Sequence, residues 1–331
     1  MKNEPIDFVV AWVDGGDPVW RSKRDQYISD SQKKNPDVGG DKRFKDTGLF
    51  KYWFRAVEKY APWVNKIYLV TDGQVPTFLN LNHPKIVLVN HKDIIDEKYL
   101  PIFNSSAICV SIGKIPNLSN NFVFFNDDMF LINNTKASDF FKNNLPRDMA
   151  VQGVLAPSNF DMFWKTRANL IATLNKNFNK KIMIRKHPFK WLNIKYPLKY
   201  NVRNIVLRKY PHFTDLYNPH VPHSYNKTSF EKVWKDNKDE MVKTLSCRFR
   251  KQDNLTEWLV RYYQLVEGNF VPTNIDKFGI VMDASEDNVD LAVASSKYKY
   301  ICINNDADGE KLQKLIKAFE SKLGKKSKFE I

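Results

Sequence analysis

The sequence predicts an α/β protein built on a doubly wound sheet, and two observations support this. Four short apolar runs end at turns that carry Asp or Asn; they cover residues 6–13, 66–72, 85–90 and 122–126. Between the first two runs, apolar residues recur at helical spacing. Open parallel sheets bind ligands outside the carboxyl ends of their strands. We therefore expect functional residues at that edge of the sheet.

The first run opens into Asp14-Gly15-Gly16-Asp17-Pro18, the pattern of a buried strand that ends in a turn. The helix that follows stops at Pro62. Its apolar positions recur at three- and four-residue steps: Leu49, Trp53, Ala56, Val57 and Tyr60. Lys51 and Arg55 lie four residues apart and share one face of this helix, where they either hold phosphate oxygens or form an ordinary exposed basic face.

The second run repeats the design of the first and ends at Asp72-Gly73. Carboxylates that follow neighbouring parallel strands meet at one edge, so Asp14 and Asp72 are candidates for ligand contact. The alternative for each is a local Asx-turn or a helix cap.

The segment 162–209 contains 13 Lys or Arg residues and no Asp or Glu. We interpret it as a basic insertion, covering about residues 150–212, in a catalytic domain that spans residues 1–306. Two interpretations remain: a solvated surface with buried aromatic residues, or a platform for an anionic acceptor or a membrane face.

Residues 307–331 are expected to form a basic C-terminal helix. Its apolar stripe comprises Leu312, Leu315, Ile316, Phe319 and Leu323, with lysines around it. Such a helix either packs on its own domain or rests on anionic lipid headgroups.

Composition narrows the partners and the location. The formal net charge of +15 favours an anionic partner. The three cysteines have no paired spacing, and the N-terminus does not resemble a signal peptide; both features favour the cytoplasm. The basic charge also allows peripheral contact with the inner face of the plasma membrane.

The sequence lacks a glycine-rich phosphate loop, a Gly-x-Ser-x-Gly elbow and a paired-cysteine motif, which argues against a P-loop ATPase, an α/β-hydrolase and a zinc module.

Two adjacent carboxylates, Asp127 and Asp128, end the aromatic run 122–126. Adjacent carboxylates are costly unless a cation binds them, and Mg²⁺ or Mn²⁺ bridging to pyrophosphate oxygens would suit this pair. A surface turn is the competing explanation.

Further along the chain, His220 and His223 lie three residues apart in a loop with Pro219 and Pro222. Such a pair suits metal binding, general base catalysis or a structural role, and we favour His220 as the base. Downstream, Arg248 and Arg250 precede an aromatic-rich helix, which would hold the Arg250 guanidinium near developing phosphate charge.

Several blocks together resemble the Stealth family, which includes bacterial capsule phosphotransferases and the animal lysosomal-enzyme GlcNAc-1-phosphotransferase. The matching blocks are residues 6–18, 43–76, 100–105 and 125–130, then 220–230, 248–250 and 302–306. One departure lies in the last block, where Asn305 stands in place of the family's usual Asp; Asp306 or Asp308 would then substitute for it.

The resemblance implies a glycosyltransferase-A-like or Rossmann-like core, a divalent metal and a UDP-N-acetylhexosamine-type donor. It also implies transfer of a hexose 1-phosphate. We expect an oligosaccharide or polysaccharide acceptor, which the basic charge allows to be anionic, release of UMP and no nucleic-acid partner. The donor cleft would comprise Asp14, Arg43, Asp46, Lys51, Arg55, Asp72, Asn104 and Ser105. Further substrate contacts would come from His223, Arg248 and Asn305.

Two rival functions stay open. A conventional metal-dependent glycosyltransferase would use similar carboxylates but attack the anomeric carbon and release UDP. A basic nucleic-acid-binding protein would use the segment 162–209 with its aromatic residues, but would leave the carboxylate-tipped strands unexplained.

Overall fold

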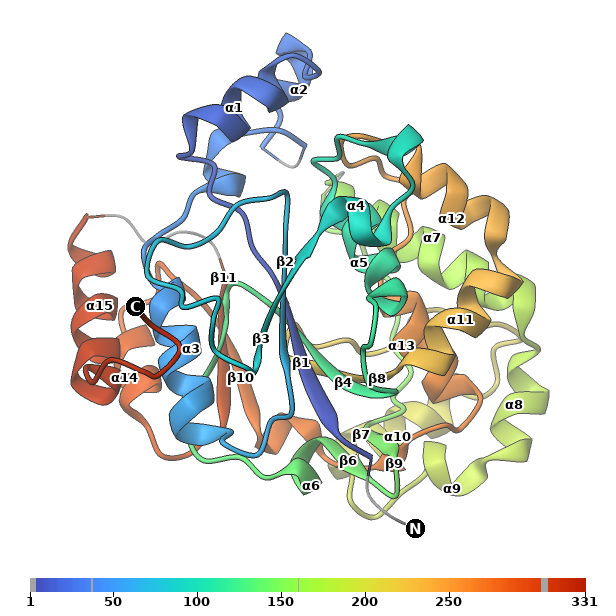
Figure 1. Ribbon diagram of the computed structural model, residues 1–331. Helices are drawn as coiled ribbons and strands as arrows, with labels where there is room; N and C mark the ends of the chain where they lie inside the picture. The colour runs from blue at the N-terminus through green and yellow to red at the C-terminus, as the bar shows by residue number, and fades with distance from the viewer. Residues whose placement is uncertain (1–3, 37, 160, 305–308) are drawn as a thin grey trace.

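We describe a computed structural model of the protein over residues 4–36, 38–159, 161–304 and 309–331, without the side chains of Lys42 and Arg43. Its main sheet has five strands in the order β3-β2-β1-β4-β8. In that order they are Ile86–Asn90, Ile67–Thr71, Ile6–Ala11, Asn121–Asn126 and His223–Asn226. The first four are parallel and β8 is antiparallel to β4, so the α/β class predicted from the sequence is confirmed (Figure 1).

The strand order reverses beside β1. The chain moves outward from β1 to β2 and β3, and then returns to place β4 on the other side of β1. Such a reversal is a topological switch point, where the loops after two adjacent strands diverge and leave a crevice. The loop after β1 carries Asp14, and the turn after β4 carries Asp127 and Asp128.

Alternate residues of the parallel strands enter two separate cores. On β1, Phe8 and Val10 face a core shared with the helix α3 (Phe50–Tyr60), whereas Val9 faces the opposite core. The opposite core contains residues of α5 (Ser105–Ser111), α11 (Lys227–Asp236), α12 (Lys238–Leu245) and α13 (Trp258–Val266). Helices cover both faces of the sheet, as expected for a parallel sheet.

A second sheet begins where the first one ends. It has the order β10-β11-β5, comprising Gly279–Asp283, Tyr300–Asn304 and Met129–Leu131. Only Asp127 and Asp128 separate β4 from β5, so the chain passes from one sheet to the other through these two carboxylates. A third small sheet joins β6 (Phe141–Lys142), β7 (Leu145–Asp148) and β9 (Val271–Pro272).

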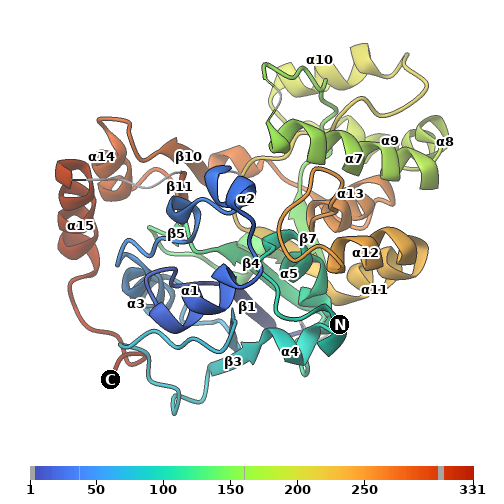
Figure 2. The same cartoon turned by 90° about the horizontal axis from the view of Figure 1, so that it is seen from above.

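The basic segment forms four helices that lie together at one side of the molecule (Figure 2). They are α7 (Met162–Asn177), α8 (Lys180–Lys186), α9 (Pro188–Trp191) and α10 (Leu198–Leu207). Leu170, Leu174 and Trp191 anchor them in the core that contains α13. Lys180 is buried among the carbonyls of Leu207 and His212, and burial lowers its pKa to about 8.

Two short helices follow β1. In α1 (Pro18–Asp25), the Asp17 side chain caps the first turn and proline occupies the first position, which stabilises the start of a helix. In α2 (Asp30–Lys34), Ser29 and Gln32 form a capping box. Figure 1 shows both helices standing above the carboxyl edge of the sheet.

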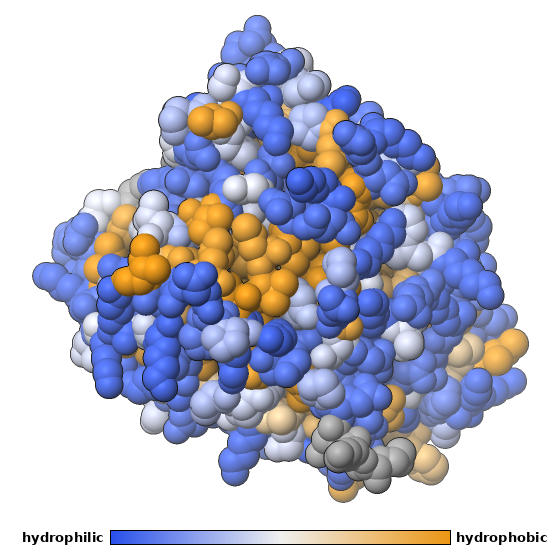
Figure 3. All heavy atoms as spheres, in the orientation of Figure 1, coloured by the Kyte–Doolittle hydropathy of each residue, from blue (hydrophilic) through white to orange (hydrophobic). Residues whose placement is uncertain are grey.

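The C-terminal helix α15 (Gly309–Leu323) belongs to the core. Leu315, Phe319 and Leu323 are buried with residues of α3 and of α14 (Val289–Ala294). Glu330, which follows α15 in the chain, forms a bidentate ion pair with Arg55 of α3. Nε and Nη2 of Arg55 each lie 2.9 Å from one carboxylate oxygen of Glu330. Figure 3 shows the face of the molecule that Figure 1 presents, with an apolar area near its centre and hydrophilic residues around it.

No helix in the described ranges has the length and apolar character that a membrane span requires.

Because Phe319 is fully buried against Tyr52 and Phe130, Phe319→Ala should lower the free energy of unfolding by about 3–5 kcal/mol. Denaturant unfolding followed by circular dichroism measures this. Lys317→Ala, two residues away and exposed, is the matched control and should change it by less than about 0.5 kcal/mol. Equal effects of the two variants would show that α15 does not stabilise the fold.

Candidate active site

The candidate site lies where β4 leaves the main sheet. Three chain segments meet there: the end of β4, the end of β11 and the loop before β8. Because β8 runs antiparallel to β4, with His223 opposite Phe124, the preceding loop reaches the carboxyl end of β4. The backbone N–H of Ile303 donates to the carbonyl of Asp128 at 2.9 Å, which ties β11 to the same point.

The imidazole of His220 is held from both sides. Its Nδ1 lies 2.9 Å from Oδ1 of Asn304, and its Nε2 lies 2.9 Å from Nδ2 of Asn126. An amide oxygen only accepts and an amide nitrogen only donates, so this arrangement fixes the proton on Nδ1 and leaves the lone pair on Nε2. The ring is therefore oriented to accept a proton at Nε2, at the end of β4.

Asp128 lies beside this ring, half-buried. Its Oδ2 is 3.9 Å from His220 Nδ1 and 3.4 Å from the sulfur of Cys302. Burial raises the pKa of Asp128, and the nearby imidazole and thiol offset this only in part. Burial and the Asp128 carboxylate raise the pKa of Cys302 far above its usual range, so its thiol stays protonated.

Asp128, His220 and Cys302 offer ligand atoms within 4.8 Å of one another. These three side chains form a hydrogen-bonded cluster, and a metal ion that bound all three would have to displace the protons of the thiol and of Nδ1. One atom does suit a hard cation: Oδ1 of Asp128 is buried and has no hydrogen-bond partner. Asp127 is exposed beside it and adds carboxylate oxygens at the turn.

A buried carboxyl group, Glu257, lies within reach of the charges of both His220 and Arg250. Burial raises the pKa of Glu257, a nearby Cys109 thiol lowers it, and the charges of His220 and Arg250 lower it further. The Nε of Arg250 donates to Oγ of Ser105 at 2.8 Å, and Nη2 donates to the same oxygen. The structure therefore brings the predicted residues His220, Ser105 and Arg250 into one neighbourhood.

Asn104 joins the chain segments that carry Ser105 and Arg250. It is fully buried, caps α5 by accepting from the backbone N–H of Ser106, and donates to the Cys247 carbonyl and to Asn254. These bonds use its oxygen and its amide nitrogen, so Asn104 positions the segments that carry Ser105 and Arg250. It does not face a ligand directly, as the predicted donor cleft would require.

A hollow of about 410 Å³ opens beside Arg250. Met162 and Lys165, at the start of α7, line it together with Asn35, Lys251, Gln252 and Asp253. Its cationic lining suits an anionic or hydroxyl-rich ligand.

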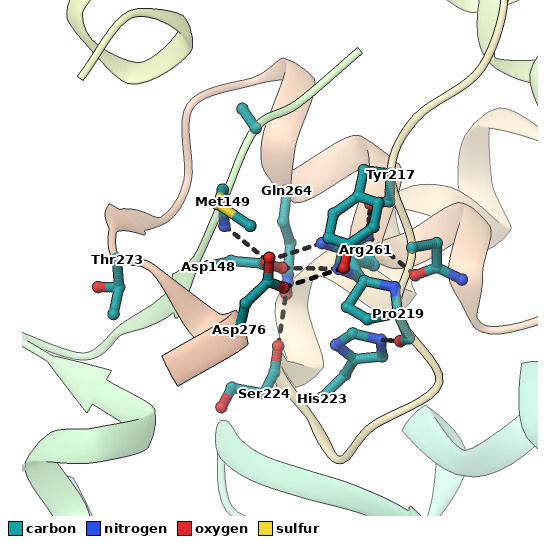
Figure 4. Close-up of polar contacts among 12 residues, drawn as sticks. Asp148, Met149, Tyr217, Pro219, His223, Ser224, Arg261, Gln264, Thr273 and Asp276 are labelled. Atoms are coloured by element: carbon teal, nitrogen blue, oxygen red, sulfur yellow. Dashed lines mark hydrogen bonds and ion pairs between the residues drawn. The ribbon is translucent and has the colours of Figure 1, made fainter. Parts of the chain in front are cut away.

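The loop that carries His220 is fixed by a fully buried ion pair, drawn in Figure 4. Arg261 on α13 donates to both carboxylate oxygens of Asp148, at 2.8 and 2.7 Å. Its Nη1 also donates to the Tyr217 carbonyl at 2.8 Å and to Oδ1 of Asn218 at 2.9 Å. A guanidinium removed from water needs all of these acceptors to satisfy its hydrogens. Tyr217 and Asn218, which begin the loop that carries His220, are therefore held in place by Arg261.

His223 has a structural place in this loop, contrary to its predicted contact with substrate. Its Nε2 donates to the Pro219 carbonyl at 3.0 Å, and the side chain is buried (Figure 4). Burial and the nearby Arg261 charge hold the pKa of His223 well below its usual range. A neutral imidazole whose Nε2 hydrogen is already bonded to the Pro219 carbonyl closes the loop.

Asp14 lies at the neighbouring strand end. Its Oδ1 accepts from the backbone N–H of Gly16 at 2.7 Å, which is the Asx-turn foreseen as the alternative. The Gln74 side chain joins this loop to the one after β2, since it accepts from Asp14 N and donates to Asp14 O and to Asp17. Asp46 is exposed nearby, and partial desolvation of its carboxyl group and the negative charge of Asp14 are among the causes that raise its pKa.

Asp72, at the end of β2, already has a cationic partner. Nζ of Lys23 on α1 lies 2.7 Å from its Oδ2, and Nδ1 of the buried His91 lies 3.8 Å from its Oδ1. Burial lowers the pKa of His91 to about 4, so that imidazole is neutral and Lys23 supplies the positive charge.

Two predicted donor-site cations lie on α3 and point elsewhere. Arg55 is paired with Glu330 and also donates to the carbonyls of Leu323 and Gly324, so its guanidinium holds the C-terminal segment. Lys51 lies 5.0 Å over the ring of Tyr52, which itself bonds Glu320 of α15. The structure brings neither of them to the His220 cluster.

The remaining predicted contacts are Arg248, Asn305 and Arg43. Arg248 is exposed and stacks over Tyr27 at 4.8 Å. Asn305 and the side chain of Arg43 lie outside the described parts of the structure.

Sequence reasoning missed four residues of the cluster: Asn126, Glu257, Cys302 and Asn304. Three of them belong to the matching sequence blocks, but amide and thiol side chains carried no catalytic signal by themselves. Glu257 precedes an aromatic helix, and only burial distinguishes it from a surface carboxylate.

Arg261→Met should lower the free energy of unfolding by about 3–5 kcal/mol, because it leaves Asp148 charged and buried without its partner. The double variant Asp148→Leu/Arg261→Met removes both charges and should recover part of that loss. A double-mutant cycle from urea unfolding measures the coupling. Additive effects of the two substitutions would contradict the proposed pairing.

Residues 4–32 match the model of Stealth protein conserved region 1, and residues 43–148 match that of conserved region 2. Two solved structures are distantly similar. Galactosyltransferase LgtC, in complex with donor and acceptor sugar analogues, is 11% identical with a TM-score of 0.41 over 95% of each chain. The bifunctional glycosyltransferase WbbM is 10% identical with a TM-score of 0.45 over 97% of this chain and 50% of that chain. With TM-scores this low, neither likeness establishes a shared fold.

Relatives of known name align over almost their full length. The exopolysaccharide phosphotransferase cps2G of Lactiplantibacillus plantarum is 44% identical over 98% of this chain and 96% of its own. The capsular polysaccharide phosphotransferase WcwK of Streptococcus pneumoniae is 41% identical over 100% and 99%. The receptor polysaccharide phosphotransferase WefC of Streptococcus gordonii is 36% identical over 99% of each chain. Since these relatives match from end to end, this chain belongs to the Stealth family of polysaccharide phosphotransferases.

Proposed function

We propose that this protein transfers a hexose 1-phosphate, of the N-acetylhexosamine type, from a UDP-sugar to a hydroxyl group of a growing surface polysaccharide. The observation that carries the proposal is the oriented His220 at the switch point, together with phosphotransferase relatives that match along the whole chain. The products are a sugar phosphodiester and UMP.

His220 would act as the general base. The acceptor hydroxyl oxygen attacks the phosphorus attached to the donor sugar, and the bond from that phosphorus to the bridging oxygen of UMP breaks. The hydroxyl proton passes to Nε2 of His220, which requires the hydroxyl to take the place of the Asn126 amide. Asp128, 3.9 Å from Nδ1, stabilises the imidazolium that results.

Arg250 would stabilise the charge on the transferred phosphoryl group. In phosphoryl transfer, charge spreads over the equatorial oxygens, so positioning and electrostatics supply most of the rate enhancement. Ser105 holds the Arg250 guanidinium through two of its nitrogens, and Glu257 compensates part of its charge. These contacts preorganise the cation before substrate binds.

A divalent cation, Mg²⁺ or Mn²⁺, is the cofactor that the proposal includes. Asp128, through its partnerless Oδ1, and Asp127 are the residues that would hold it. When bound, such an ion neutralises pyrophosphate charge and favours departure of the nucleotide.

Donor binding would use the loops after β1 and β2. Asp14, Asp46 and Asp72 lie at that edge of the sheet, and Lys23, paired with Asp72, is a cation that sequence reasoning did not single out. Gln74 holds the two loops together.

The released nucleotide tests the proposal. Purified protein with Mg²⁺, UDP-N-acetylhexosamines and oligosaccharide acceptors should release UMP and form a phosphodiester, both identified by mass spectrometry. Arg250→Ala should lower this turnover by about 100- to 1000-fold, because the phosphoryl charge loses a preorganised donor.

The matched control is Lys235→Ala, which removes an exposed cation on α11 and should leave turnover unchanged. Release of UDP with a glycosidic product would place the protein with conventional glycosyltransferases. Retention of more than about a tenth of the activity by Arg250→Ala would remove Arg250 from the reaction.

A further inference from the structure

The basic helices α7–α10 carry an unusual share of exposed apolar side chains. Of the eighteen large hydrophobic residues that are exposed in the described parts of the chain, ten lie between Phe163 and Tyr210. Phe189 is 81% exposed and Ile194 is 100% exposed. A contiguous apolar surface on a soluble protein marks an interaction site, whereas scattered single residues do not.

One helix shows that this exposure is patterned. On α10, Leu198, Val202 and Ile205 follow one another at steps of four and three residues and are 78%, 49% and 58% exposed. Tyr200 and Leu207 are buried on the opposite side of the same helix. The helix is therefore apolar on two faces, and only the buried face packs against the protein.

The neighbouring helices continue this apolar face. A shallow hollow of about 50 Å³ is lined jointly by Ile184 and Arg185 of α8, Pro188 of α9, Leu192, Ile205 of α10 and Arg208, which follows α10. The three helices therefore meet at one hollow, and we call the exposed apolar residues on and between them the α8–α10 surface. It comprises Ile182, Phe189, Leu192, Ile194 and the exposed stripe of α10.

Cations flank the apolar residues. Arg185, Lys186, Lys195, Lys199, Arg208 and Lys209 are exposed, and none forms an ion pair with a described residue. The segment 162–209 accounts for 13 of the 15 net positive charges of the chain and contains no acidic residue.

We propose that the α8–α10 surface docks on an anionic lipid bilayer. Aliphatic and aromatic side chains beside unpaired lysines and arginines match the interface of such a bilayer, where the apolar side chains enter the acyl boundary and the cations meet the headgroups. A dissolved anionic polysaccharide would satisfy the cations but would leave Phe189 and Ile194 in water. This assignment does not depend on the reaction that the active site performs.

The position of the surface suits an enzyme that works on a membrane-bound acceptor. The same unit of helices begins with Met162 and Lys165, which line the hollow next to Arg250. Docking through α8–α10 would hold that hollow at a fixed distance from the bilayer.

Vesicle flotation tests the inference. The full chain should float with vesicles of phosphatidylcholine containing phosphatidylglycerol, bind much less to phosphatidylcholine alone, and lose binding as salt rises, because salt screens the cations. Phe189→Ser/Ile194→Ser removes two exposed apolar groups, leaves every charge in place, and should lower the vesicle partition coefficient by at least about tenfold.

The matched control is Leu81→Ser/Leu291→Ser, which makes the same type of change at two exposed sites elsewhere and should bind like the unmodified chain. Unchanged melting temperatures in both double variants show that folding is intact. The inference is overturned if the unmodified chain does not float, or if Phe189→Ser/Ile194→Ser floats equally well. It is also overturned if a soluble anionic polysaccharide displaces the chain from vesicles while the apolar substitutions have no effect.

Discussion

The buried ion pair between Arg261 and Asp148 is the constraint on which the site depends. Both groups lie away from water, so their charges must be satisfied by each other and by the backbone of the loop that precedes His220. One turn before Arg261, the N-cap residue of the same helix is Glu257, a buried carboxyl group whose pKa burial raises and the charges of His220 and Arg250 lower in part. A single helix therefore fixes the loop that carries His220, the residue proposed as the base.

Sheet topology brings the remaining partners to that point. The reversal of strand order beside β1 opens the crevice, and the two-residue passage from β4 into β5 forces Asp127 and Asp128 to its edge. The second sheet then returns β11, whose Asn304 and Cys302 close around His220 and Asp128. Residues 126, 220 and 304 are distant in sequence, yet each lies at the end of a strand or just before one, where backbone constraints place side chains precisely.

Periodicity was enough to predict the parallel strands and the α3 helix, because these features are local in sequence. The functional role of the strand-end carboxylates stays a prediction. The roles of Arg55, Asn104 and His223 were not predictable from local pattern. Arg55 pairs with Glu330, Asn104 bonds Asn254, and His223 closes its loop against a carbonyl, and each contact depends on tertiary packing. Glu257 was missed for the same reason: a carboxylate's burial is a property of the fold, and no motif marks it.

The central claim is that His220, oriented by Asn126 and Asn304, takes the acceptor proton. The most direct measurement is the single-turnover rate of His220→Gln at saturating donor, together with the donor Kd, since glutamine can still hydrogen-bond both amides but cannot act as a base. The account predicts a rate loss of about 100- to 10,000-fold with the donor Kd nearly unchanged. A rate within about tenfold of the unmodified protein would contradict it.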